Sequence, residues 1–185
     1  MFFRKSRVEP LPVTMSAVRM GERVLQIGVD DAAIVSAIAA KAGLSGNAAI
    51  AVSDDREAAR AHSGSAGAGV LVDIRVTSPS SLPFDNEAFD LVVVHSTHGR
   101  ISSLDEQTRL AATREWHRVL RRGGRAMTIE AGPASGIAGV FKPQRGHEAY
   151  ARAGGIIAAL EAGGFRPVRL LAEREGCRFV EGIKV

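Results

Sequence analysis

A buried strand that runs into a glycine turn and then a helix is the feature that most constrains this fold. The stretch "VLQIGVDDAAIVSAI" at 24–38 places Gly28 after a mainly apolar run and then repeats Ile34, Val35 and Ile38 at helical spacing. Nucleotide-type cofactors commonly bind at turns of this kind. The stretch therefore predicts an α/β domain whose first turn is a candidate ligand site.

Four further apolar stretches predict that strands and helices alternate along the chain. They are "AAIAV" at 48–52, "VLVDIRV" at 70–76, "DLVVVHS" at 90–96 and "RAMTIEA" at 125–131. The unbroken apolar run of 90–96 indicates a strand that is buried on both faces, as in a parallel sheet. The terminal segments "RPVRLLAE" and "CRFVEGIKV" flank "REG" and predict an antiparallel hairpin.

The segments between these strands predict helices with particular ends. We expect a short helix at "REAARAH" (56–62), broken by a flexible "SGSAGAG" connection at 63–69. Ser103 and Glu106 form a possible capping box before a helix at 107–122 that stops at Gly123 and Gly124. Another helix is expected around 147–162.

Together these elements predict a three-layer, doubly wound, mostly parallel seven-stranded sheet with a C-terminal antiparallel hairpin, a Rossmann-like α/β fold. We expect an N-terminal arm at 1–13, where "EPLPV" discourages regular structure, and one domain at 14–185. Ligands of such sheets gather beyond the carboxyl ends of the strands. Functional residues are therefore expected after Gly28, Val52, Val76 and Val94.

Composition excludes several classes of function. The net charge is +4, but there is no lysine-rich run and only 5% of residues are aromatic, so we expect no nucleic-acid partner. Cys177 is the only cysteine, which excludes an internal disulfide and a multi-cysteine metal site. No apolar run approaches the ~20 residues of a transmembrane helix, and "MFFRKSR" lacks a signal-peptide pattern. We expect a cytoplasmic protein.

Four stretches in this order resemble the class I S-adenosylmethionine-dependent methyltransferases, in particular the group that acts on small molecules. They are "VLQIGVDDA", "IAVSDD", "LPFDNEAFDLVVV" and "EWHRVLRRGGRAMTIE", and the likeness spans residues 21 to 185. The last two are specific when they occur together. The resemblance implies S-adenosylmethionine as cofactor and an unidentified small-molecule acceptor.

The resemblance also assigns cofactor-binding positions, several of which depart from the family pattern. Gln26 replaces an acid, Gly28 is retained, and Asp30 and Ala32 replace glycines. The acid expected at the ribose aligns with Ser53, with Asp54 one position later, and the residue expected beside the adenine is Ser78. The cofactor-binding residues predicted on this basis are Gln26, Gly28, Asp30, Ser53, Asp54, Ser78 and His95. We expect weakened or rearranged cofactor binding.

Two acidic residues at the first turn admit another role. The carboxylates of Asp30 and Asp31 are expected to accept hydrogen bonds from the first amides of the following helix. Asp54 is similarly a candidate N-cap of the next helix. Because several cofactor motifs depart from the family pattern, an alternative is a catalytically inactive protein of the same fold. Such a protein would serve as a binding or scaffolding subunit and would have a protein partner. Binding of a nicotinamide cofactor in the same crevice is a third alternative.

Candidates for chemistry lie after the strand at 90–96. A neutral imidazole of His95 or His98 could take a proton from an acceptor nucleophile. No carboxylate or cysteine nearby completes a ligand set around this pair, so we expect no metal. The segment 132–146 and the residues after it, including Tyr150, could close over a substrate as a lid. Arg118, Arg121, Arg122 and Arg125 predict a solvated basic rim at the opposite edge.

Overall fold

Strand order places the first and fourth strands side by side at the centre of one seven-stranded sheet. The structure is a computed structural model that describes residues 9–43, 48–132 and 145–185. The sheet runs β3-β2-β1-β4-β5-β7-β6. The strands are β1 (Val24–Ile27), β2 (Ala48–Val52), β3 (Asp73–Val76), β4 (Phe89–Ser96), β5 (Leu120–Ala131), β6 (Val168–Arg174) and β7 (Cys177–Ile183). The first five pair in parallel and β7 pairs antiparallel with both β5 and β6, which confirms the predicted sheet and hairpin.

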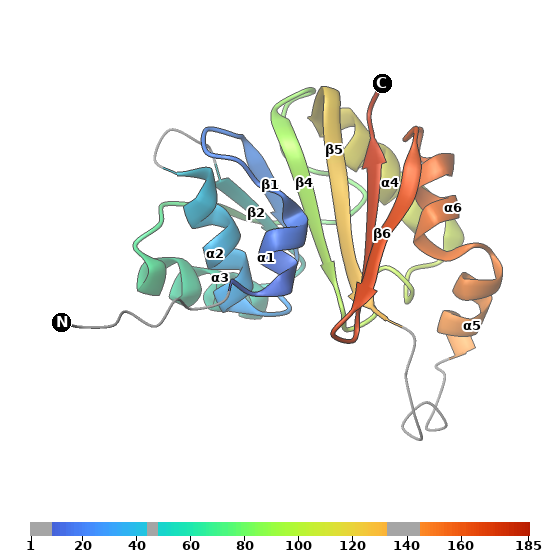
Figure 1. Cartoon of the computed structure of the whole chain (residues 1–185), viewed down its shortest axis with the longest axis horizontal. Coiled ribbons are helices and arrows are strands. Elements are labelled where there is room, and N and C mark those ends of the chain that lie inside the picture. Colours follow the sequence, from blue (N-terminus) through green and yellow to red (C-terminus); the bar gives the residue numbers. More distant parts are fainter. Residues whose placement is uncertain (1–8, 44–47, 133–144) are drawn as a thin grey trace.

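Helices cover both faces of the sheet (Figure 1). They are α1 (Leu11–Ser16), α2 (Ala32–Ala42), α3 (Asp55–Ala68), α4 (Glu106–Val119), α5 (Arg145–Arg152) and α6 (Gly155–Ala162). Side chains of α1, α2 and α3 share clusters with one face, and those of α4, α5 and α6 with the other. None of the described helices combines the length and apolar character that crossing a bilayer requires.

The central strand β4 contributes to a hydrophobic core on each face of the sheet. Leu91 and Val93 pack with α1 and α2, whereas Val92 and Val94 pack with α4 and α6. All four are fully buried, and burial of each such side chain is worth roughly 1.5–3 kcal/mol. Alternate residues of a strand point to opposite faces, so this run has to be apolar throughout. The expectation of a strand buried on both faces is confirmed.

The predicted break after residue 62 is wrong, because α3 continues through Ala68. A Cβ added at Gly64 would lie 2.8 Å from the Ser36 Oγ and 2.9 Å from the Ala32 carbonyl oxygen of α2. The glycine therefore lets two helices approach closely instead of ending one of them. Gly69, in the left-handed conformation, is the residue that ends α3.

Other helix ends also differ from the prediction. Asp105, not Ser103, caps α4, and its Oδ1 accepts a 2.8 Å hydrogen bond from the Thr108 amide. α4 ends at Val119 and β5 begins at Leu120, so Gly123 and Gly124 lie within the strand. The single helix expected at 147–162 is two helices, α5 and α6, separated at Gly154 with φ 88°.

The N-terminal segment is more ordered than its two prolines suggested. α1 begins at Leu11, with Pro10 at the N-cap, where a missing N–H costs no helical hydrogen bond. Val13 is fully buried against α2 and the sheet. Packed structure therefore begins inside the range predicted for an arm, whose residues 1–8 lie outside the described part.

The arginines near the β5 turn have partners within the chain. The ion pairs are Arg118 with Glu115, Arg121 with Asp90 and Arg125 with Glu22. Burial alone would raise the pKa of the Asp90 carboxyl, but hydrogen bonds from Arg23 and Arg121 outweigh it and hold that pKa at about 2. Most of the expected basic rim is therefore structural pairing: one pair joins β5 to β4, one joins β5 to the segment before β1, and one lies within α4.

Candidate functional site

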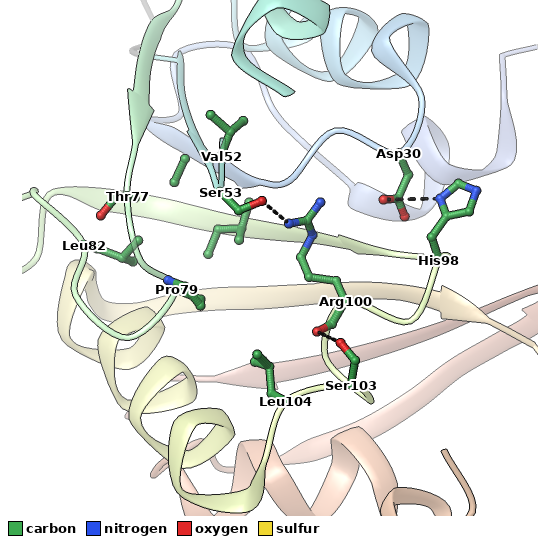
Figure 2. A pocket seen from close by; sticks show the side chains of 12 residues that line it. Asp30, Val52, Ser53, Thr77, Pro79, Leu82, His98, Arg100, Ser103 and Leu104 are labelled. Atoms are coloured by element: carbon green, nitrogen blue, oxygen red, sulfur yellow. Dashed lines mark hydrogen bonds and ion pairs between the residues drawn. The ribbon is translucent and has the colours of Figure 1, made fainter. Parts of the chain in front are cut away.

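A cavity of about 380 Å³ lies beyond the carboxyl ends of β1 to β4, where the strand order reverses. This is the edge at which doubly wound sheets bind ligands. Its walls come from the strand ends and the loops that follow them (Figure 2). The lining residues are Ile27, Asp30, Ala51, Val52, Ser53, Thr77, Pro79, Leu82, His98, Arg100, Ser103 and Leu104.

Apolar side chains gather at one end of this cavity. Val52 at the end of β2, Pro79 and Leu82 in the loop after β3, and Leu104 before α4 all line it (Figure 2). A flat apolar group could stack in such a space, and the Ser53 and Thr77 hydroxyl groups lie along its edge.

Asp30 lies at the other end, where it joins the first turn to the loop after β4. Its Oδ2 accepts hydrogen bonds from the Thr97 amide at 2.6 Å and the Thr97 hydroxyl at 2.7 Å. Burial would raise the pKa of this carboxyl, but the bonds from Thr97 outweigh burial and lower it. Asp30 is therefore an anion at neutral pH that borders the cavity.

The prediction that both acids cap α2 is half correct. Asp31 is the N-cap and accepts from the Ala33 and Ile34 amides at 2.8 and 3.4 Å. Asp30 bonds to Thr97 instead, and so ties β1 to β4 across the switch in strand order.

Arg100 extends from the loop after β4 and lies across Gly28 at the end of β1. A Cβ added at Gly28 would lie 2.6 Å from the Arg100 Cζ and 2.7 Å from its Nη2. Gly28 also has φ 80°, a conformation that other residues adopt at a cost. The Arg100 guanidinium donates to the His95 carbonyl oxygen at 3.2 Å, to the Ser53 hydroxyl at 3.4 Å and to the Glu57 carboxylate.

Glu57 in the first turn of α3 reaches back to the end of β2. Its Oε2 accepts from the Ser53 amide at 2.9 Å and the Ser53 hydroxyl at 2.8 Å, while its Oε1 pairs with Arg100 and, at 3.6 Å, with Arg60. The side chain is only 7% exposed. Burial would raise the pKa of Glu57, but hydrogen bonds from Ser53 and Arg100 outweigh it and lower that pKa.

Two of the predicted site residues, Gln26 and His95, form a buried pair outside the lining of the cavity. The Gln26 Nε2 donates to the Val35 carbonyl oxygen at 2.8 Å, so its Oε1 is left to accept from the His95 Nε2 at 3.0 Å. Both side chains are buried, and burial lowers the pKa of His95 to about 4. His95 is therefore neutral at pH 7, and neither residue is among those lining the cavity.

The remaining predicted residues divide between the cavity and its surroundings. Ser53 lines the cavity, and Asp54 is the N-cap of α3, accepting from the Glu57 amide at 2.8 Å. Ser78 bonds to Ser80, while its neighbours Thr77 and Pro79 line the cavity. His98 lines it too, with a side chain 78% exposed and Nδ1 3.5 Å from the Asp30 Oδ1 (Figure 2).

Sequence reasoning missed three residues that shape the site: Thr97, Arg100 and Glu57. The two in the loop follow the predicted strand β4 at its carboxyl end, which is the available signal for them. Glu57 carries no such signal, since it lies in a helix and reaches the site through Ser53.

Two further expectations concern metals and a lid. Within residues 9–43, 48–132 and 145–185, no three His, Cys, Asp or Glu side chains are placed to hold a metal ion. Most of the proposed lid, 133–144, lies outside the described residues. Tyr150 is buried, with its hydroxyl donating to the Glu130 Oε1 at 2.7 Å and Arg109 stacked 4.8 Å from its ring centroid. Tyr150 therefore packs α5 against the core.

The sequence matches one protein family. The profile of the family described as "Methyltransferase domain" matches residues 25–128, more than half of the chain. That range contains β1 except Val24, β2 to β4, α4 and every residue that lines the cavity. The comparison with curated proteins finds no match.

Solved structures share the fold at low sequence identity. A SAM-dependent methyltransferase from Aquifex aeolicus has a TM-score of 0.75 at 18% identity, over 94% of this chain and 87% of that chain. A putative O-methyltransferase from Nostoc punctiforme has a TM-score of 0.71 at 14% identity, over 94% of this chain and 55% of that chain. A putative methyltransferase from Haloferax volcanii, solved in complex with the Trm112 activator, has a TM-score of 0.64 at 12% identity, over 93% and 86% of the two chains. The chain belongs to the methyltransferase domain family: it is a class I S-adenosylmethionine-dependent methyltransferase, with S-adenosylmethionine as its cofactor.

Proposed function

We propose that this protein transfers the methyl group of S-adenosylmethionine to a small-molecule acceptor at the cavity beyond β1 to β4. The observation that carries the proposal is the division of this one cavity into an apolar end and an end bordered by opposite charges, Asp30 and Arg100. An adenine ring binds to an apolar surface, whereas the amino acid group of the cofactor binds to charged partners. We propose the cytoplasm as the compartment, in keeping with a single cysteine.

The residues present fit the cofactor if Arg100 turns away from Gly28. Val52, Pro79, Leu82 and Leu104 would hold the adenine, and Asp30 would face the ammonium group. Bound there, the cofactor supplies a methyl group on a sulfonium as the electrophile. Ligand pockets usually measure roughly 300–1,000 Å³, so a cavity of about 380 Å³ has room for the cofactor and little else. The acceptor would then be small, or would bind at the mouth of the cavity.

His98 is the better placed of the two histidines predicted as a base. It is exposed, it lines the cavity, and Asp30 lies beside its ring. A neutral imidazole there could take the proton that an acceptor hydroxyl or amine loses as the methyl group is transferred. His95 would act by positioning, since its Nε2 is bonded to Gln26 and it does not line the cavity. Methyl transfer also depends on in-line alignment of the reactants, so His98→Ala should reduce the rate without abolishing it.

Calorimetric titration with S-adenosylmethionine and S-adenosylhomocysteine tests the cofactor part of the proposal. Saturable heat at micromolar ligand supports it, and no heat at millimolar ligand contradicts it. The acceptor part is tested with radiolabelled S-adenosylmethionine and a panel of small hydroxyl, amine and thiol compounds. If protein that binds the cofactor transfers label to none of these compounds, the acceptor part of the proposal is contradicted.

One observation favours a second candidate, a binding subunit that performs no methyl transfer. Arg100 covers Gly28 and is paired with Glu57, so part of the surface expected to meet the cofactor is in contact with protein. The Haloferax volcanii neighbour, solved with an activator protein, is an example of a partnered chain of this fold. Co-purification of the natural protein with a stoichiometric partner, together with no turnover by either the chain or the pair, would support this candidate.

A further inference from the structure

We infer that Arg100 and Glu57 form an ion pair that the cofactor opens: Arg100 turns from Glu57 to the carboxylate of the cofactor, and Glu57 then accepts hydrogen bonds from its ribose hydroxyls. This inference rests on the proposed function of the cavity. It assigns binding roles to two residues that the sequence pattern does not mark.

The position of Glu57 supports its role at the ribose. The family resemblance places an acid at the end of β2, where this chain has Ser53. Both hydrogen bonds from Ser53 go to the Glu57 Oε2, so they hold the carboxylate at that strand end. The Oε1 pairs with Arg100 and, at a longer 3.6 Å, with Arg60. Once Arg100 leaves, that oxygen can accept from a hydroxyl group, and α3 supplies the acid that β2 lacks.

The position of Arg100 requires it to move before a ligand can contact Gly28. Its guanidinium covers Gly28 at distances too short for any added atom. The other bonds of the guanidinium are long, 3.2 Å to the His95 carbonyl oxygen and 3.4 Å to the Ser53 hydroxyl. Arginine has a long flexible side chain, so it can swing away while the loop backbone stays in place.

The charges explain why the exchange suits this particular ligand. The side chains of Arg100 and Glu57 are 21% and 7% exposed, and leaving either one unpaired in such surroundings is costly. A ligand with a carboxylate offers Arg100 a replacement partner, in the bidentate geometry that guanidinium favours. Vicinal hydroxyls offer Glu57 replacement donors. Asp30 remains on the same side of the cavity for the ammonium group, so each charge on the amino acid part meets its opposite.

Two probes separate the carboxylate from the rest of the ligand. S-adenosylhomocysteine carries the amino acid group, and 5′-methylthioadenosine keeps the adenine and ribose but lacks it. Calorimetry should show that the unmodified protein prefers S-adenosylhomocysteine. In Arg100→Gln this probe should bind about 10- to 100-fold more weakly, the range expected for losing a charged hydrogen-bond partner. 5′-Methylthioadenosine should bind as well as before or better, because Gly28 is uncovered.

The Glu57→Gln variant should behave differently, because both probes contain the ribose. Both should lose affinity by a similar factor, about 5- to 10-fold, and the preference between them should stay unchanged. Arg169→Gln is the matched control: this arginine also pairs with a glutamate, Glu181, but lies on the edge strand β6 away from the cavity. It should leave both affinities unaltered. Thermal unfolding of each variant establishes that it is folded.

The outcomes distinguish this inference from the proposed function. If the unmodified protein binds neither probe, the proposed function fails, and the inference with it. Suppose instead that the unmodified protein binds both probes, and that Arg100→Gln either keeps the original preference between them or weakens the binding of both equally. The cavity then holds the cofactor, but the exchange of partners by Arg100 is overturned. An Arg100→Lys variant that keeps part of the preference supports recognition by charge.

Discussion

The guanidinium of Arg100 lies over the backbone of Gly28, so one side chain links the loop after β4 to the end of β1.

 The strand order places β1 beside β4, with the loops after Ile27 and Ser96 at the same edge of the sheet. Glycine at position 28 leaves the space that the guanidinium fills. Under the proposal, the glycine that would admit the cofactor also admits the arginine that the cofactor would displace.

The first prediction concerns Gly28→Ala, with Gly69→Ala as its matched control. Both glycines have positive φ, 80° and 66°, so each substitution should lower the free energy of unfolding by about 1–2 kcal/mol. Gly69 has no neighbouring atom within 4 Å of an added Cβ, whereas Gly28 has Arg100. Gly28→Ala should therefore cost at least about 0.5 kcal/mol more. Urea unfolding measures the difference.

A double variant tests the cause of that additional cost. If it comes from Arg100, Gly28→Ala should cost less in an Arg100→Ala background than in the unmodified protein. Equal costs in the two backgrounds would show that Arg100 does not limit the space at Gly28.

The second prediction concerns the tie between Asp30 and Thr97. Asp30→Asn should lower the free energy of unfolding at pH 7 by about 1–3 kcal/mol, because one charged oxygen accepts both Thr97 hydrogen bonds. Asp31→Asn is the control, since asparagine caps a helix about as well as aspartate, and its effect should stay within about 0.5 kcal/mol. Similar losses in the two variants, measured by urea unfolding, would argue against a special role for the Asp30 carboxylate.

The third prediction is a pH dependence of stability that comes from His95. Its pKa is about 4 in the folded protein, lowered by burial from the usual 6.5. The unfolded chain therefore binds the proton more readily, and stability falls as the pH falls from 6.5 towards 4. Between pH 7 and pH 5 the loss from this residue should be about 2 kcal/mol.

A His95→Gln variant isolates this effect, because glutamine can still donate to Gln26 but does not titrate. Its free energy of unfolding should change less between pH 7 and pH 5 than that of the unmodified protein. The pKa of Asp90 is about 2, so protonation of this carboxyl weakens its ion pairs only below the range from pH 7 to pH 5. Parallel pH profiles of the two proteins would show that His95 is not buried as a neutral group.

Much of the fold could be predicted because hydrophobic pattern determines it locally. The run through Val92 and Val93 has to be buried on both faces, and "RPVRLLAE" with "CRFVEGIKV" predicts the hairpin of β6 and β7. The end of α3 was predicted wrongly because the role of Gly64 depends on α2 packing against it. A glycine in a helical stretch gives no local sign of whether it ends the helix or contacts another one.

The location of the site could be predicted better than the residues that form it. The strand ends were identified, and Ser53, Asp30 and His98 do border the cavity. The pairs that organise it join distant residues: Arg100 and Glu57 are 43 positions apart, and Asp30 and Thr97 are 67 apart. Only the folded sheet brings such partners together, so no local pattern could indicate them.

A crystal structure of the protein with S-adenosylhomocysteine tests the central claim most directly. The account predicts the adenine among Val52, Leu82 and Leu104, with the Arg100 guanidinium turned away from Gly28 onto the ligand carboxylate. A ligand bound elsewhere, or Arg100 still lying across Gly28 beside a bound ligand, would contradict it.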